Sequence, residues 1–303
     1  MKVIHVMTKN NDHICDSHFG LSTLLVTFLS VLKWKSFGYR VKLYVDEHFK
    51  QVFEDYGLLE LYDEVDDSYF VNNDFYEQFN ISKEYFWAFS KLFIHMNEKD
   101  NFIMSDLDFI PLKDFHNVID ENNNYIYYRE LIDDKTYPNS LLTSSDYVFP
   151  EWLTWKEQPV NTAVTYLSDE SLKKLYTEEA IKFAQHNTEE SDNEGMNVTN
   201  RMVFAEQRLL AECANYLNIE LTDIKSNYET ICNPREIHYF CYKQMDDKNP
   251  HNWVMFFLDK LYKEFPEVYA KVIERPEYLE YKELIANEGF NFKTPKALLR
   301  TQW

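Results

Sequence analysis

Residues 102–111 of this 303-residue chain read FIMSDLDFIP, and this segment carries more structural information than any other. Its apolar start predicts a short buried strand, which Asp106 and Asp108 follow directly. If the strand continues, two carboxylates at positions i and i+2 point to the same side. Hard oxygen ligands at the carboxyl end of a sheet strand suit Mg²⁺ or Mn²⁺ held together with a diphosphate. Unpaired carboxylates between apolar flanks would be costly, so a bound cation is the simplest explanation.

The residues before this segment predict alternating strands and helices. Apolar runs of strand length occupy 3–7 and 41–45, and apolar residues recur at helical spacing over 21–32 and 49–56. The order strand, helix, strand, helix is typical of an α/β fold with a parallel sheet. Farther along, the pattern predicts a helix capped by Ser82 that carries Phe86, Phe89, Phe93 and Met96, strands over 125–128, 160–167 and 237–241, and helices over 170–186, 202–217 and 253–264.

Composition narrows the class of protein. Only 5 glycines are present, and they form neither a dinucleotide-binding fingerprint nor a P-loop. The net charge of −20 would repel nucleic-acid phosphates and anionic lipid, so we expect no nucleic-acid partner. The 4 cysteines are scattered, and the sequence has neither a signal-peptide pattern nor an apolar run long enough to span a membrane. We therefore expect a cytoplasmic protein without an integral membrane segment.

Together with its neighbours, the acidic segment resembles the metal-dependent glycosyltransferases of the GT-A fold. The pattern Trp87-x-x-x-Lys91 precedes SDLDFIP, as in these enzymes, and residues 160–164 (VNTAV) resemble the strand that lines their sugar and acceptor pocket. Glu206 and Gln207 stand early in a helix where retaining enzymes of the family 8 type carry Asp-Gln. Residues 238–243 (HYFCYK) resemble their His-x-x-Gly-x-x-Lys segment, with Cys241 in place of Gly and a His-to-Lys spacing one residue shorter.

The resemblance implies a Rossmann-like mixed sheet flanked by helices. It spans a catalytic domain over residues 1–245, which leaves a helical C-terminal extension over 246–303. It implies a hexosyltransferase-like enzyme that moves a sugar from a nucleotide-sugar donor, most simply a UDP-sugar, to a saccharide or other hydroxyl acceptor. By the same resemblance, the residues that hold Mn²⁺ or Mg²⁺ are Asp106, Asp108 and His238. The residues that bind the nucleotide sugar are Thr8, Lys91, Asp106 and Lys243. The resemblance implies that the catalytic residues are Gln207, Glu206 and Asn161.

The stereochemistry of transfer depends on which of two neighbours acts. An amide cannot accept a proton, but the carbonyl dipole of Gln207 can stabilise a developing oxocarbenium ion while the leaving diphosphate takes the acceptor's proton. This hypothesis predicts retention of the anomeric configuration. If Glu206 instead acts as a general base, transfer inverts it.

Each candidate also has a purely structural interpretation. His238 can be a hydrogen-bonded core histidine, Lys91 can lay its stem along Trp87, Asn161 can cap a strand edge, and Gln207 can lie on a helix surface.

Two other functions also remain open. One is a metal-dependent nucleotidyltransferase, although residues 8–12 (TKNND) lack the Gly-rich phosphate loop of that class. The other is a non-catalytic carbohydrate-binding module.

Overall fold

The computed structural model describes residues 1–8, 20–72, 75–132, 136–141, 143, 146–187, 198–224, 236–238 and 250–293. The chain divides into two compact units, neither of which is continuous in sequence. The first unit comprises Met1–Cys15, Arg40–Asp106 and Phe115–Ser226, and the second comprises Asp16–Tyr39, Leu107–Asp114 and Asn227–Trp303. The acidic segment therefore crosses the boundary, with Asp106 in the first unit and Asp108 in the second.

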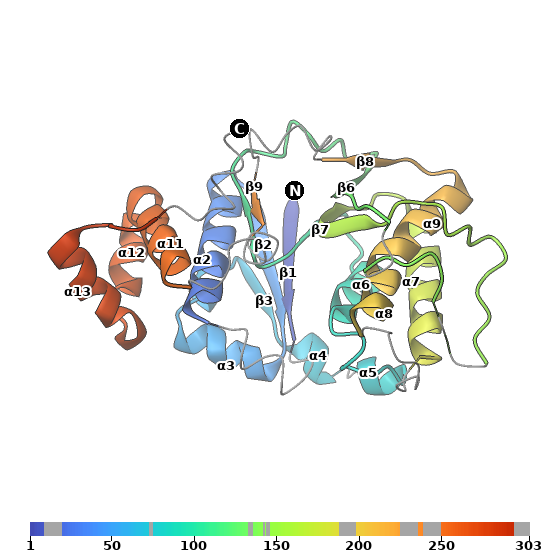
Figure 1. The fold of residues 1–303 in the computed structure, drawn as a ribbon, viewed down its shortest axis with the longest axis horizontal. Helices are drawn as coiled ribbons and strands as arrows, with labels where there is room; N and C mark the ends of the chain where they lie inside the picture. The colour runs from blue at the N-terminus through green and yellow to red at the C-terminus, as the bar shows by residue number, and fades with distance from the viewer. Residues whose placement is uncertain are drawn as a thin grey trace. The chain divides into compact units, whose positions relative to one another are not determined.

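A seven-stranded mixed sheet forms the centre of the first unit (Figure 1). Its strand order is β3-β2-β1-β4-β7-β6-β8, and β7 alone runs opposite to the others. The buried strands β1, β4 and β7 are rich in Val, Ile, Met and Thr, which pack well on a pleated surface. The strands are β1 (Lys2–Met7), β2 (Arg40–Val45), β3 (Glu64–Asp66), β4 (Ile103–Ser105), β6 (Asn124–Arg129), β7 (Val160–Tyr166) and β8 (Leu221–Asp223).

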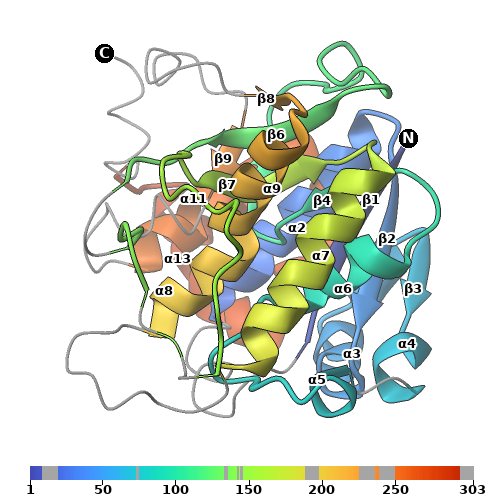
Figure 2. The ribbon, with the colours of Figure 1, turned by 90° about the vertical axis from the view of Figure 1, so that its right-hand side faces the viewer.

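Helices pack beside this sheet around a core rich in aromatic rings. Phe86, Phe183 and Phe204 are fully or almost fully buried and belong to one cluster. Figure 2 shows α7 beside α6 and α9, whose contacts enclose part of that cluster. The helices of this unit are α3 (Glu47–Asp55), η1 (Leu59–Leu61), α4 (Ser68–Asn72), α5 (Phe75–Gln78), α6 (Phe89–Asn97), α7 (Glu170–Gln185), α8 (Val198–Val203), η2 (Phe204–Arg208, a π-helical turn) and α9 (Leu209–Leu217).

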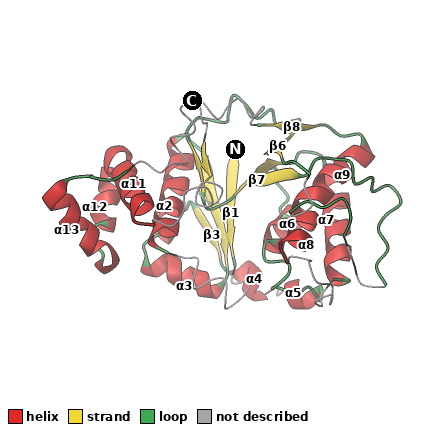
Figure 3. Cartoon of the chain, viewed as in Figure 1, coloured by secondary structure: helices red, strands yellow, loops and turns green. Residues whose placement is uncertain are grey.

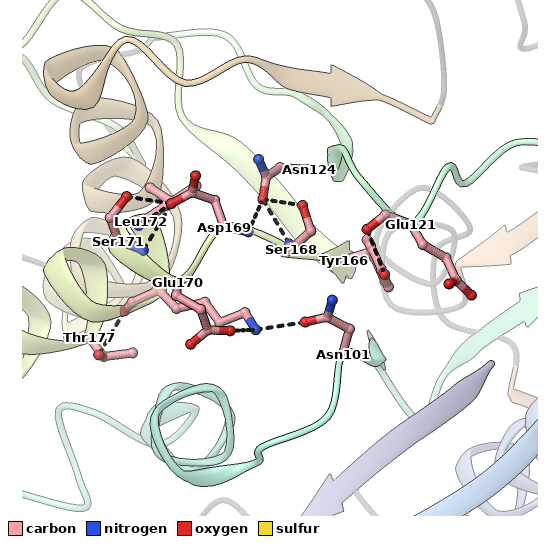
Figure 4. Close-up of polar contacts among 11 residues, drawn as sticks. Asn101, Glu121, Asn124, Tyr166, Ser168, Asp169, Glu170, Ser171, Leu172 and Thr177 are labelled. Carbon is pink, nitrogen blue, oxygen red and sulfur yellow. Dashed lines mark hydrogen bonds and ion pairs between the residues drawn. The ribbon is translucent and has the colours of Figure 1, made fainter.

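The turn between β7 and α7 is fixed by side-chain oxygens (Figure 4). Asp169 caps α7, because its Oδ1 accepts hydrogen bonds from the backbone nitrogens of Ser171 at 2.9 Å and Leu172 at 3.0 Å. Asn124, at the start of β6, accepts with its Oδ1 from the backbone nitrogens of Ser168 at 2.9 Å and Asp169 at 3.1 Å. The start of α7 is therefore tied to the central sheet.

The second unit combines helices, among them α2, α11, α12 and α13 in red in Figure 3, with a two-stranded sheet of β5 and β9. Its elements are α2 (Leu21–Ser36), β5 (Phe109–Pro111), β9 (Glu236–His238), α11 (Pro250–Glu264), α12 (Pro266–Val272), η4 (Pro276–Tyr278) and α13 (Leu279–Glu288). The hydroxyl of Ser30 donates to the carbonyl of Phe109 at 2.6 Å, and Trp34 stacks on the Phe109 ring. These two contacts hold β5 on α2. Across the described parts of the chain, every helix is too short or too polar to span a membrane.

The structure confirms the α/β prediction and the mixed sheet that the resemblance implies, because β7 is antiparallel to both of its neighbours. It corrects the prediction in two places. The strand before Asp106 does not continue, because Leu107 and Asp108 form a turn and β5 belongs to another sheet. Ser82 does not cap α6, because α6 begins only at Phe89. The residues between Ser82 and Phe89 form turns, and the carbonyl of Phe86 accepts a hydrogen bond from the hydroxyl of buried Tyr76. The domain boundary near residue 245 stays a prediction.

Two buried histidines make the first unit sensitive to acid. His5 and His95 are almost fully buried, and burial lowers the pKa of each from 6.5 to about 3. The unfolded chain therefore binds more protons than the folded chain between these pH values. As the pH falls through this window, each histidine should lower the free energy of unfolding by about 1.4 kcal/mol per pH unit.

Urea unfolding between pH 7 and 4.5 tests this expectation. The free energy of unfolding of His95→Gln should fall less steeply with decreasing pH than that of the wild type. The two slopes should differ by about 1.4 kcal/mol per pH unit, the contribution of one histidine. The same substitution at exposed His48 is the control. Parallel slopes for the wild type and His95→Gln would show that His95 is already protonated in the folded chain.

Candidate functional site

A buried lysine joins two acidic residues in the first unit. Lys91, on α6, forms ion pairs with Asp106 at the end of β4 and with Glu206 in η2, the latter at 2.8 Å. The exposed fractions of these side chains are 17% for Lys91, 23% for Asp106 and 7% for Glu206, so the three charges face one another with little access to water. We call these three residues the Lys91 cluster. It unites positions that are up to 115 residues apart in the sequence.

The charges of the Lys91 cluster depend on one another. Burial by itself lowers the pKa of Lys91, but the two carboxylates outweigh this effect and raise that pKa well above its ordinary value. The ammonium therefore stays charged throughout the ordinary pH range. Lys91 thus supplies a cation beside Asp106 from within the chain, and the metal ion expected from the sequence stays a prediction.

The carboxyl end of β4 determines the position of Asp106. Its backbone nitrogen donates to the carbonyl of Ala163 in β7 at 2.8 Å, so the residue is held where β4 ends. Because β1 and β4 are parallel neighbours, Thr8 follows β1 at the same edge, and its side chain is buried. Carboxyl ends of parallel strands are where α/β sheets bind ligands.

Two local irregularities meet at Glu206. In the pairing of β6 with β7, Ile126 lies opposite Thr165 and Tyr128 opposite Asn161, so two steps along β6 match four along β7. Within the extra length of β7, the hydroxyl of Thr162 donates to Glu206 Oε1 at 2.8 Å. Bulges and π-helical turns both occur frequently at functional sites.

A side chain from a neighbouring helix contacts the π-helical turn η2. The hydroxyl of Tyr176, on α7, donates to the backbone carbonyl of Glu206. That carbonyl is thus satisfied from outside its own helix, which accommodates a wider turn at this point. The sequence predicted one regular helix over 202–217, whereas the structure divides it into α8, η2 and α9.

The other two candidate catalytic residues lie outside the Lys91 cluster. Gln207 accepts a hydrogen bond at its Oε1 from the hydroxyl of Tyr137 at 2.5 Å. Asn161 donates from Nδ2 to Glu130 Oε1 at 2.8 Å and accepts at Oδ1 from the backbone nitrogen of Ala163 at 3.0 Å. The structure thus joins Glu206 to Lys91 directly and to Asp106 through Lys91, and Gln207 follows Glu206 in the same turn.

The remaining metal candidates belong to the second unit. Asp108 is half-buried and precedes β5, and the backbone of His238 in β9 lies in register opposite Phe109. The side chain of His238, like all of Lys243, falls outside the described residues. Among the side chains that are described, no group of three His, Cys, Asp or Glu residues is arranged to hold a metal ion.

Sequence reasoning missed Thr162, Tyr137 and Tyr176. Each acts through one hydroxyl, and their partners lie 44, 70 and 30 residues away along the chain. A Thr is common in strands, so Thr162 in β7 gives no signal by itself, and Tyr137 and Tyr176 belong to no motif of the sequence. The one available hint was the polar pair Asn161-Thr162 within a largely apolar strand.

Comparisons with known proteins give a family but no activity. The chain matches a family described as a family of unknown function (DUF6734) over residues 1–275. No curated protein matches its sequence. Among solved structures, PaToxG glycosyltransferase is similar, with a TM-score of 0.42 and 11% identity over 95% of this chain and 84% of that chain. Mouse xyloside xylosyltransferase 1 (apo form) gives a TM-score of 0.39 and 12% identity over 73% of this chain and 84% of that chain.

Proposed function

Because the chain belongs to DUF6734, a family of unknown function, we propose its activity from its own residues. We propose a glycosyltransferase of the GT-A type, which moves a sugar from a nucleotide-sugar donor to an acceptor hydroxyl. The observation that supports it most is the Lys91 cluster. Lys91, Asp106 and Glu206 come from three separate motifs of the sequence resemblance, and Lys91 contacts both carboxylates in the folded chain. Both TM-scores lie below 0.5 and contribute nothing to this proposal.

We further propose that Asp106, Asp108 and His238 hold Mn²⁺ or Mg²⁺. Two carboxylates and one imidazole form a donor set that suits these ions. When bound, the ion would offset the negative charge that grows on a leaving diphosphate. Thr8, Lys91 and Lys243 would contact a UDP-sugar, and Lys91 is suited to this because an ammonium attracts phosphate oxygens strongly.

Retention of configuration is the stereochemical outcome that we propose. A base must be accessible to the acceptor hydroxyl, but the side chain of Glu206 is only 7% exposed and its Oε1 accepts from both Lys91 and Thr162. These contacts favour a structural role for Glu206 over the role of base. Gln207, the next residue, would stabilise the developing positive charge of the sugar through its amide dipole. The leaving diphosphate would then accept the proton of the acceptor hydroxyl. We propose the cytoplasm as the compartment, because the sequence shows no cysteine-pairing pattern.

Proton NMR of donor hydrolysis tests this function. We expect the protein with MnCl₂ to release UDP from at least one of UDP-glucose, UDP-galactose, UDP-N-acetylglucosamine and UDP-xylose, and EDTA to stop the release. Because these donors are α-linked, retention predicts that the α-anomer of the free sugar appears first. A β-anomer that appears first would return Glu206 to the role of base. If none of the four donors reacts in the presence of Mn²⁺, the proposed function is wrong.

A further inference from the structure

Two loop segments, 137–138 and 154–155, are bound to side chains that follow Glu206. Arg208 is almost fully buried and donates through Nη1 to the carbonyl of Pro138 at 3.1 Å and through Nη2 to the carbonyl of Trp155. One turn later, Glu212 accepts from the backbone nitrogen and the hydroxyl of Thr154, both at 2.9 Å. The connection between β6 and β7 is therefore anchored on η2 and α9 at several points.

Tyr137 is held from both ends by this arrangement. Its backbone carbonyl accepts from Arg208 Nη1 at 3.4 Å, and its hydroxyl donates to Gln207 Oε1. Its side chain is buried, so its ring has little freedom to move. Two consecutive residues of η2, Gln207 and Arg208, thus contact opposite ends of one tyrosine.

The terminal torsion of a glutamine is otherwise poorly fixed. The rotamers of the side-chain amide about its last bond are broad and roughly two-fold, so an unrestrained amide can exchange its oxygen and nitrogen. A hydrogen bond from a fixed hydroxyl to Oε1 selects one of these orientations. It leaves the second lone pair of Oε1 and the two N–H donors directed away from Tyr137.

We infer that Tyr137 is a positioning residue, which orients the amide of Gln207 toward the transferred sugar. This inference rests on the proposed function and names a residue that the sequence resemblance does not contain. Tyr137 acts through Gln207 and takes no part in the transfer itself. Its effect should therefore fall on kcat, and it should disappear when Gln207 is removed.

A double-mutant cycle tests the inference on UDP release from the UDP-sugar that the wild type accepts. We expect Tyr137→Phe to lower kcat about tenfold, the size expected for one hydrogen bond, with little change in the KM for the donor. Gln207→Ala should lower kcat further. Tyr137→Phe in the Gln207→Ala background should then cost nothing more, because the group that it orients is absent.

Tyr147→Phe is the matched control. Tyr147 lies in the same connection, is equally buried, and its hydroxyl has no hydrogen-bond partner among the described residues. Its removal should leave kcat unchanged. If Tyr137→Phe behaves like Tyr147→Phe, or costs the same with and without Gln207, Tyr137 does not position the amide, although the proposed function survives. If Gln207→Ala is fully active, both the catalytic role of Gln207 and the positioning role of Tyr137 are wrong. A wild type that releases UDP from none of the donors overturns the function and the inference together.

Discussion

Replacing Lys91 with methionine should destabilise the protein by about 3–5 kcal/mol, the cost of removing one partner from a buried ion pair. Methionine fills a similar volume but leaves Asp106 and Glu206 facing each other without a cation. Both carboxylates are mostly shielded from water, so solvent cannot replace the missing charge. The measurement is the free energy of unfolding in urea at pH 7.

Lys173→Met provides the comparison for this loss. Lys173 is also buried, but its carboxylate partner Glu170 is 79% exposed and stays hydrated when the lysine is removed. The expected cost is about 1 kcal/mol or less. Neutralising the two carboxylates as well, in Lys91→Met with Asp106→Asn and Glu206→Gln, should restore most of the stability that Lys91→Met loses. Equal losses for the two lysine variants would mean that the Lys91 cluster holds no special charge balance.

Replacing Asp108 with asparagine should weaken the Mn²⁺-dependent binding of UDP about a hundredfold, because the ion loses a charged oxygen ligand. The fold should be unaffected, since Asp108 lies in a half-exposed turn before β5. A hundredfold change in affinity corresponds to about 2.7 kcal/mol, which a ligand-induced thermal shift detects easily. The measurement is the stabilisation of the wild type and the variant by UDP with and without MnCl₂.

Asp100→Asn controls for the loss of one negative charge. The side chain of Asp100 is 84% exposed, and its ion pair with Lys2 is long, at 3.7 Å. This variant should bind UDP like the wild type, and EDTA should reduce binding by the wild type to the level of Asp108→Asn. If UDP binds all three proteins equally well with and without Mn²⁺, the metal assignment is wrong.

The fold was predictable where local patterns are long enough. β1, α2, β2 and α3 could be predicted because each is a run of at least six residues with its own periodicity. β3, β5 and β8 have three residues each and were not predicted, whereas the equally short β4 was predicted from the apolar residues before Asp106. The reversed direction of β7 was also invisible, because a fully buried strand has the same composition whichever way it runs.

The candidate site likewise contains residues that could be predicted from the sequence and residues that could not. Asp106 was predicted from its acidic pair after an apolar strand, whereas Lys91 and Glu206 were predicted only through the resemblance to GT-A enzymes. Their contact with one another was not predictable, since it depends on the pairing of β4 with β7 and on the π-helical turn. Tyr137 and Thr162 are uncharged and act only through tertiary contacts, so no local pattern marks them.

The π-helical turn η2 determines the directions in which the side chains of α9 point relative to those of α8. One residue of an α-helix corresponds to a rotation of about 100°, and a π-helical turn accommodates one residue more than an α-helical turn. Glu206 contacts Lys91, while Arg208 and Glu212 bind carbonyls and amides of the connection between β6 and β7. Shortening η2 by one residue would turn α9 by about 100° relative to α8. A regular helix could then satisfy the buried charges or the loop contacts, but not both, so this single extra residue makes the two sets of contacts compatible.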